Sequence, residues 1–166
     1  MTVRILIGMK KFWILGLSFL GVLFLDILTK EYIITHFPMY SSRPVIPGLF
    51  NLLHIRNKGV AFGILGGGAP VWRDIVLVLF PIIAMSGILI FAFFYPQQKT
   101  GILLSLGGIL GGALGNLIDR FRFRAVIDFL DIYWGQYHWP AFNVADSAIT
   151  LGVLFLAFVY MFKKEE

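Results

Sequence analysis

The sequence contains no cysteine and little charge. The absence of cysteine excludes disulfide bonds and metal sites that depend on thiolate ligands. Charged residues make up only 14% of the chain, whereas a soluble domain carries about 25%. The sequence is instead 58% hydrophobic, with a mean hydropathy of +0.84. This composition predicts an integral membrane protein.

The length limits how often the chain can cross a membrane. A spanning helix needs about 20 mostly apolar residues, so 166 residues leave no room for a separate soluble domain. The predicted fold class is an all-α membrane protein, a single domain with four transmembrane helices. The apolar runs place the spans at about residues 12–34, 71–95, 101–118 and 140–162. A small β-hairpin is expected outside the spans, and a short amphipathic segment is expected between the third and fourth spans.

The net charge of +5 is modest, and the basic residues are scattered along the sequence. Contact with anionic membrane lipids is therefore expected, and binding of nucleic acid is not. The basic residues do not orient the spans, because those on the side opposite the termini outnumber those on the side of the termini.

The first apolar run carries an ion-pair motif. The run Phe12–Leu25 resumes after Asp26 and continues to about Ile34 without a small-residue cleavage site, so we expect an uncleaved first helix. Asp26 and Lys30 are four residues apart and therefore share one helix face. They form either a self-neutralising pair near the membrane surface or a pair that orients a neighbouring site.

Residues 36–68 interrupt the helical pattern. Three prolines lie between positions 38 and 47, and then residues 49–56 mix apolar and polar side chains. Residues 57–59 read as a turn, and residues 60–65 are apolar again, which is typical of a hairpin. Because an open sheet edge cannot lie in hydrocarbon, we expect this unit at the membrane interface.

The third span contains a seam of glycines. Gly107, Gly111 and Gly115 recur every four residues, with Gly108 and Gly112 beside them. This spacing predicts close packing against other helices.

Polar residues gather near the end of the third span and the start of the fourth. Asn116, Asp119 and Arg120 share a face of the third span. The fourth span carries a polar stripe at i, i+3, i+4 and i+7, made of Asn143, Asp146, Ser147 and Thr150. Such a stripe must face protein or water, and acids within a membrane segment are functional candidates.

Asp128 lies between these two spans, with apolar residues on both sides. If Asp128 and Asp146 converge, they cannot both ionise easily and will share a proton. One carboxylate can then activate a water while the other polarises a carbonyl. No other catalytic set is evident, because no phosphate-binding loop is present and three residues, His36, His54 and His138, lack metal-ligand spacing. Asp131 is predicted to be a solvated or structural acid.

From the residues alone, three functions remain open. The first is an aspartyl hydrolase, and the second is a path for protons or cations. The third is a structural helix bundle pinned by Asp26–Lys30 and Asp119–Arg120. The number of acids and amides at one end of the bundle argues against the third.

Five motifs occur in order, and together they resemble the lipoprotein signal peptidases, the signal peptidase II family, over nearly the whole chain. They are LDILTK with Asp26 and Lys30, NKGVAFG with Asn57 and Gly59, GNLIDR with Asn116, Asp119 and Arg120, VIDFLD with Asp128, and FNVADS with Asn143 and Asp146. Val60 departs from the alanine common in that family.

The resemblance implies an aspartyl endopeptidase of the bacterial inner membrane, with cytoplasmic termini and an active site near the periplasmic face. Its substrate would be a prolipoprotein whose cysteine already carries diacylglycerol, cut just before that cysteine. No metal or cofactor is expected. The partners expected are this substrate and membrane lipids, and the chain is expected to act as a monomer.

The resemblance also assigns roles to residues. Asp128 and Asp146 match the catalytic pair. Residues that match positions lining the site or positioning substrate are Asn57, Asn116, Arg120 and Asn143. Asp26, Lys30 and Asp119 match the supporting polar shell. The hairpin of residues 46–65 matches a periplasmic cradle, and Trp134 and Trp139 suit an interface belt.

Overall fold

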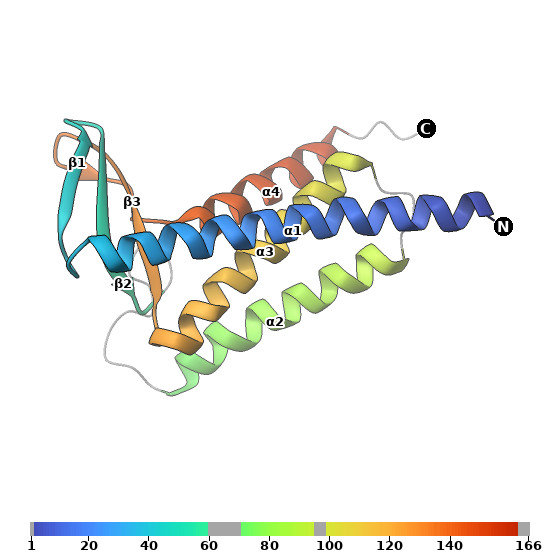
Figure 1. Ribbon diagram of the computed structural model, residues 1–166, viewed down its shortest axis with the longest axis horizontal. Helices are drawn as coiled ribbons and strands as arrows, with labels where there is room; N and C mark the ends of the chain where they lie inside the picture. Colours follow the sequence, from blue (N-terminus) through green and yellow to red (C-terminus); the bar gives the residue numbers. More distant parts are fainter. Residues whose placement is uncertain (1, 60–70, 95–98, 163–166) are drawn as a thin grey trace.

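The computed structural model describes residues 2–59, 71–94 and 99–162. Within these residues, long helices form a bundle and a small antiparallel sheet lies across one end of it (Figure 1). The helices are α1 (Thr2–His36), α2 (Val71–Phe94), α3 (Thr100–Phe123) and α4 (Val144–Met161). The strands are β1 (Ser42–Ile46), β2 (Phe50–Asn57), β3 (Val126–Trp134) and β4 (Tyr137–His138).

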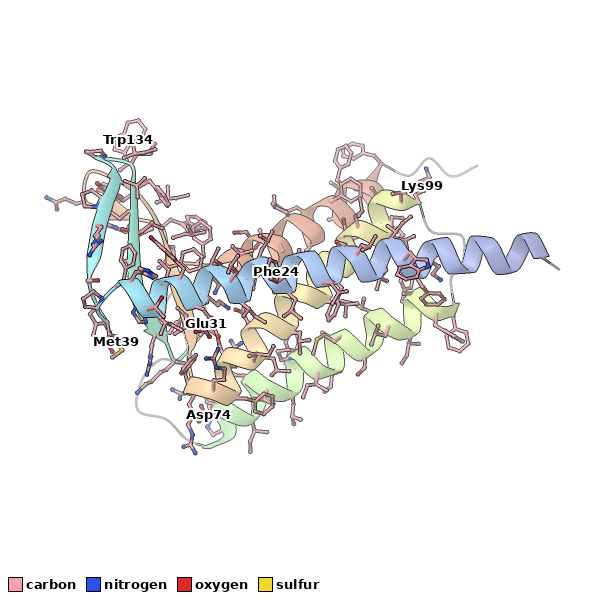
Figure 2. All side chains as sticks on the ribbon, viewed as in Figure 1. Phe24, Glu31, Met39, Asp74, Lys99 and Trp134 are labelled. Atoms are coloured by element: carbon pink, nitrogen blue, oxygen red, sulfur yellow. The ribbon has the colours of Figure 1, made fainter. Side chains whose placement is uncertain are left out.

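In the part of the chain that the structure describes, four helices are long and apolar enough to cross a membrane, which confirms the predicted number of spans. Their outer faces carry exposed apolar side chains such as Phe24, Phe80 and Leu151, which suit contact with hydrocarbon. α1 begins and α4 ends at the same end of the bundle, opposite the sheet (Figure 1). Figure 2 places Asp74 toward the sheet end and Lys99 toward the other end.

Two helix boundaries differ from the sequence prediction. α3 continues to Phe123 and ends where Arg124 adopts a left-handed conformation, with φ of 52°. α4 begins at Val144 instead of Pro140 because Asn143 is its N-cap: the Asn143 side chain accepts a hydrogen bond from the amide of Asp146. Side-chain caps of this kind satisfy amides that the first helical turn leaves unpaired.

A hairpin is present, and the strand expected at residues 49–56 corresponds to β2. β2 pairs with β1, which precedes it, through a turn at residues 47–49. The predicted partner at residues 60–65 lies outside the described residues. Pro44 is compatible with β1 because β1 is an edge strand of the described sheet.

The sheet is also larger than predicted. The segment expected between α3 and α4 supplies β3, which pairs antiparallel with β2, and β4, which pairs with β3. Four of the first five side chains of β3 are buried without alternation, because one face meets α1 and the other meets the polar end of the bundle.

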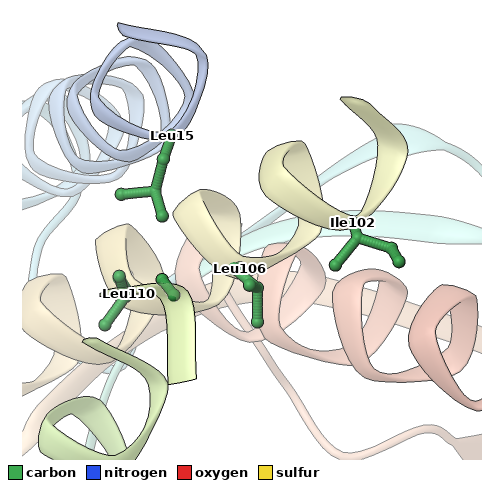
Figure 3. Packing of buried hydrophobic residues seen from close by; sticks show 5 residues of the cluster. Leu15, Ile102, Leu106 and Leu110 are labelled. Atoms are coloured by element: carbon green, nitrogen blue, oxygen red, sulfur yellow. The ribbon is translucent and has the colours of Figure 1, made fainter. Parts of the chain in front are cut away.

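α3 is the central helix of the bundle and packs against α1, α2 and α4. Its first half forms an apolar cluster with Leu15 of α1 and Ala92 of α2 (Figure 3). The α3 residues in this cluster are Ile102, Leu106 and Leu110. A second cluster joins the end of α1 to β3 through Ile33, Phe37, Ile127 and Phe129. The sheet is therefore held directly on the end of α1.

The glycine seam of α3 brings helix backbones into contact. A Cβ at Gly111 would lie 2.5 Å from the backbone oxygen of Phe19 in α1. A Cβ at Gly112 would lie 2.6 Å from the backbone oxygen of Ala145 in α4. α3 therefore uses two neighbouring glycines to approach two helices at once, as the sequence predicts.

We expect Gly111→Ala to destabilise the protein, because its methyl group has no space beside Phe19. Overpacking of this kind costs about 1–3 kcal/mol. Gly108→Ala is the matched control in the same helix, since its Cβ would meet nothing closer than 3.9 Å. Thermal unfolding of the purified proteins should show a lower midpoint for Gly111→Ala alone, and equal midpoints for the two variants would contradict this packing account.

Candidate active site

A cavity of about 480 Å³ opens where α3, α4 and the sheet meet. It contains both acids that the sequence predicts to converge, Asp128 from β3 and Asp146 from the first turn of α4. The other polar residues that line it are Asn57, Asn116, Arg120, Ser147 and Thr150. Three of the four residues of the predicted polar stripe, Asp146, Ser147 and Thr150, therefore line this cavity.

Asp128 is held by two amides. Its Oδ1 accepts a hydrogen bond of 2.8 Å from Asn143 Nδ2, and its Oδ2 accepts one of 3.0 Å from Asn57 Nδ2. Asn57 is itself oriented by the backbone N–H of Gly59, which donates to Asn57 Oδ1 at 2.9 Å. With 2% of its surface exposed, Asp128 is a buried carboxyl whose two oxygens are both fixed in direction.

Asp146 is linked to Asp128 through a chain of amides. Asn116 Nδ2 donates to Asp146 Oδ1 at 2.7 Å. Asn143 Nδ2, the donor to Asp128, also lies 3.3 Å from Asn116 Oδ1. Both asparagines offer donors to carboxylate oxygens, so they orient the two acids toward the same cavity.

Lys30 is the centre of a buried charge cluster beneath the cavity. Its Nζ lies 2.8 Å from Asp26 Oδ2 and 2.9 Å from Asp119 Oδ2. The same atom donates to Asn116 Oδ1 at 2.9 Å. The lysine and both acids are almost completely buried. The Asp26–Lys30 pair is therefore not a surface pair: it joins α1 to α3 and to the asparagine beside Asp146.

The two acids of this cluster also hold the backbone next to the cavity acids. Asp26 Oδ1 accepts from the amide of Ala145 at 2.9 Å, and Ala145 directly precedes Asp146. Asp119 Oδ2 accepts from the amide of Ile127 at 3.0 Å, and Ile127 directly precedes Asp128. Through Lys30, one rigid unit therefore sets the backbone positions of both cavity acids.

Arg120 places a positive charge beside the cavity. Its Nη1 donates to the backbone oxygen of Asn116 at 3.3 Å, and its guanidinium interacts electrostatically with Asp146 and Asp128. An arginine in this position can attract a polar group entering the cavity and offset the charge of an ionised acid.

Burial raises the pKa of Asp128 to about 7, and the negative charge of Asp146 contributes to the increase. Hydrogen bonds from Asn57 and Asn143 act in the opposite direction. Asp128 and Asp146 therefore form an interacting pair of acids. At neutral pH such a pair contains both a proton donor and a proton acceptor.

This pKa makes stability depend on pH. An Asp in the unfolded chain has a pKa of about 3.9, so the folded protein binds more protons than the unfolded chain between about pH 4 and pH 7. The free energy of unfolding therefore falls as pH rises through that interval. We expect Asp128→Asn to remove this dependence and to raise the midpoint of thermal unfolding at about pH 8.

The control for this measurement is Asp74→Asn, which changes a half-exposed acid paired with its neighbour Arg73. From pH 5 to pH 8, the midpoint of thermal unfolding of the control should change with pH as the midpoint of the wild type does. If the midpoint of Asp128→Asn depends on pH in the same way as that of the wild type, the raised pKa of Asp128 is contradicted.

The structure brings all nine predicted site residues into one connected group. Asp131 is structural rather than solvated: it is buried and accepts hydrogen bonds from Asn51 Nδ2 at 2.8 Å and contacts His138 Nδ1 at 2.8 Å. His54 is also buried, with Nδ1 2.9 Å from the backbone oxygen of Phe37. In the described ranges, no three or more His, Cys, Asp or Glu side chains form a group that could hold a metal ion.

The sequence reading missed two features of the site. It placed Asn143 inside the fourth helix, although an Asn three residues before an acid is an N-cap signal. It also missed the rim formed by residues 139–142, which line the cavity on the side of the sheet. Phe142 is bridged to Leu130 of β3, and such long-range pairing leaves no local signal.

The chain is similar to known proteins over most of its length. A family model described as "Signal peptidase (SPase) II" matches residues 18–162. A lipoprotein signal peptidase from Syntrophus aciditrophicus is 46% identical over 95% of this chain and 99% of its own length. One from Nitratidesulfovibrio vulgaris is 42% identical, covering 96% of this chain and 94% of the relative. A solved structure described as a bacterial membrane enzyme has a TM-score of 0.79 and 31% identity, covering 90% of this chain and 92% of that one.

Proposed function

Because the chain belongs to the signal peptidase II family, we propose that it removes signal peptides from prolipoproteins by an aspartyl mechanism. Asp128 and Asp146 are the catalytic residues, and the bond cut directly precedes a cysteine that carries diacylglycerol. Asn57, Asn116, Asn143 and Arg120 position the two acids and the substrate. Asp26, Lys30 and Asp119 support them from beneath.

One observation carries this proposal. Two acids that are 18 positions apart in the sequence line one cavity, and a continuous chain of asparagine amides joins their carboxyl groups. The raised pKa of Asp128 supports a pair that holds one proton at neutral pH. Peptide hydrolysis without a nucleophilic side chain requires one acid and one base in this arrangement.

The proposed reaction conserves protons. The ionised carboxylate removes a proton from water, and the resulting hydroxide forms a bond to the carbonyl carbon. The protonated carboxyl donates a hydrogen bond to the carbonyl oxygen and stabilises the charge that develops there. When the C–N bond breaks, the newly protonated carboxyl transfers its proton to the leaving amine. The signal peptide leaves with a new terminal carboxyl group, whose remaining proton passes to the released amine, so the products are a carboxylate and an ammonium group and the pair again holds one proton.

We propose that the site faces the periplasm and that both termini are cytoplasmic, in the bacterial inner membrane. The exposed aromatic side chains of Trp134, Tyr137 and Trp139 at the sheet end support an interfacial position. A substrate anchored by a helix and by acyl chains meets the cavity at that depth. The chain acts as a monomer, with membrane lipids and the prolipoprotein as its partners.

The test uses purified protein and a diacylglyceryl-modified prolipoprotein. Mass spectrometry should detect a mass loss equal to the signal peptide, with the new amino terminus at the modified cysteine. A parallel sample with the unlipidated precursor measures how strongly the lipid is recognised. Acid-dependent ion flux in vesicles without cleavage would overturn the proposal in favour of a transport path.

A further inference from the structure

A second cavity, of about 320 Å³, lies at the sheet end between α2 and α3. Three of its lining residues are cations, namely Lys58, Arg120 and Arg124, and one is an acid, Asp74. The remaining residues that line it are Asn57, Leu77, Val78 and Ala125. It shares Asn57 and Arg120 with the active-site cavity, although neither catalytic acid lines it.

The charges of this cavity are poorly balanced by protein groups. Asp74 Oδ1 is already engaged by Arg73, whose Nη2 lies 2.9 Å away. Lys58 and Arg124 are exposed at the cavity, and within the described ranges neither forms an ion pair with an acid. Two cations with unfilled hydrogen-bonding capacity therefore face the same space, and they favour an anion.

An apolar groove continues from the cationic cavity. The groove has a volume of about 310 Å³ and is lined by Asp74, Ile75, Val78 and Leu79 on α2. It shares Asp74 and Val78 with the cationic cavity. Ile75 and Leu79 are exposed and belong to a membrane-spanning segment. The groove therefore leads from the charged end of the helix toward the hydrocarbon region.

The backbone at the cavity supports a specific position for Arg124. Its φ of 52° lies in the left-handed region, where glycine is the usual residue at a helix end. A side chain at such a position is disfavoured by about 1 kcal/mol relative to glycine. Arg124 and Lys58 line the same cavity at the point where the chain leaves α3.

We propose that this cavity and groove bind an anionic glycerophospholipid from the surrounding membrane. Its phosphodiester lies between Lys58 and Arg124, with Arg120 behind, and one acyl chain follows Ile75, Val78 and Leu79 along α2. The occupant is anionic because cations outnumber acids in the cavity. It is an amphiphile because the cavity opens into an apolar groove at the depth where a helix end meets head groups.

The test measures lipid binding rather than cleavage, so its outcome is independent of the proposed function. Full-length Asp128→Asn protein in a neutral detergent is titrated with phosphatidylglycerol, with phosphatidylcholine, and with inorganic phosphate. Retained lipid is detected by native mass spectrometry, and the midpoint of thermal unfolding gives a second readout. We expect phosphatidylglycerol to bind most tightly and to raise the midpoint.

Two variants locate the site. Lys58→Gln with Arg124→Gln should weaken phosphatidylglycerol binding at least about tenfold, because it removes two charge-assisted contacts. Val78→Phe keeps both cations but fills the junction of cavity and groove, and it should weaken lipid binding while leaving phosphate binding unchanged. Arg43→Gln with Lys99→Gln is the control of equal charge loss and should bind as the wild type does.

Three results would overturn the proposal. The first is equal binding of phosphatidylglycerol and phosphatidylcholine, and the second is equal binding of inorganic phosphate, which would leave an anion site without a lipid. The third is an equal loss of phosphatidylglycerol binding in the control variant and in the Lys58→Gln with Arg124→Gln variant, because the effect would then come from net charge alone.

Discussion

Asp128→Asn and Asp146→Asn should each lower the rate of prolipoprotein cleavage by about 10³-fold or more, while both proteins still insert into the membrane and fold. Losing one member of a set of residues that acts as a unit has effects of this size. An asparagine keeps the shape of the acid it replaces and one of its two acceptor oxygens, but it cannot accept a proton from water. Cleavage is measured by the mass of the product from a diacylglyceryl-modified precursor.

The control for these substitutions is Asp131→Asn. Asp131 is another buried carboxyl on β3, three residues from Asp128, and its partners are Asn51 and His138 rather than the cavity amides. Its substitution should lower the rate by less than about tenfold, an effect of structure alone. Near-normal cleavage by either Asp128→Asn or Asp146→Asn would reject the assignment of the pair.

Lys30→Met should destabilise the folded protein by about 3–5 kcal/mol, because it leaves two buried acids without their cation. Asp26 and Asp119 would retain only backbone donors, the amides of Ala145 and Ile127. Since those amides adjoin Asp146 and Asp128, the proposed catalytic acids, cleavage should fall together with stability. Thermal unfolding and the yield of folded protein measure the first effect.

Two further variants identify the cause. Combining Lys30→Met with Asp26→Asn and Asp119→Asn removes all three charges and should recover much of the lost stability, since neutral amides are less costly to bury than unpaired carboxylates. Glu31→Gln is the control at the adjacent position: it removes a half-exposed surface pair with Arg122 and should change stability by less than about 1 kcal/mol. A triple variant less stable than Lys30→Met would contradict the account.

Local patterns predicted much of this fold. The apolar runs identified the spans because the need for about 20 apolar residues is a local property of the sequence. The close helix packing along the glycine seam was equally predictable, since Gly107, Gly111 and Gly115 fall on one helix face. The sheet was harder to predict, because strand pairing joins residues far apart. Asn57 pairs with Val126 across the sheet, and no sequence pattern near either residue predicts this pairing.

The sequence predicted which polar residues would lie together, but not the contacts between them. Acids and amides in apolar surroundings were informative because burying them requires partners. The sequence could not predict the hydrogen bonds that connect them. The contacts of Asp26 with the Ala145 amide and of Asp119 with the Ile127 amide depend on how α1, α3, β3 and α4 converge. A side chain that binds a backbone amide does not require a particular residue type at the partner position. The sequence at that position therefore gives no indication of the contact.

The measurement that tests the central claim most directly is single-turnover cleavage by four proteins: the wild type, Asp128→Asn, Asp146→Asn and the variant with both changes. If the two carboxyls work as one proton-sharing unit, the doubly substituted protein should retain the same residual rate as either single variant. Independent contributions would instead multiply, and a double variant slower by the product of the two single losses would contradict the claim.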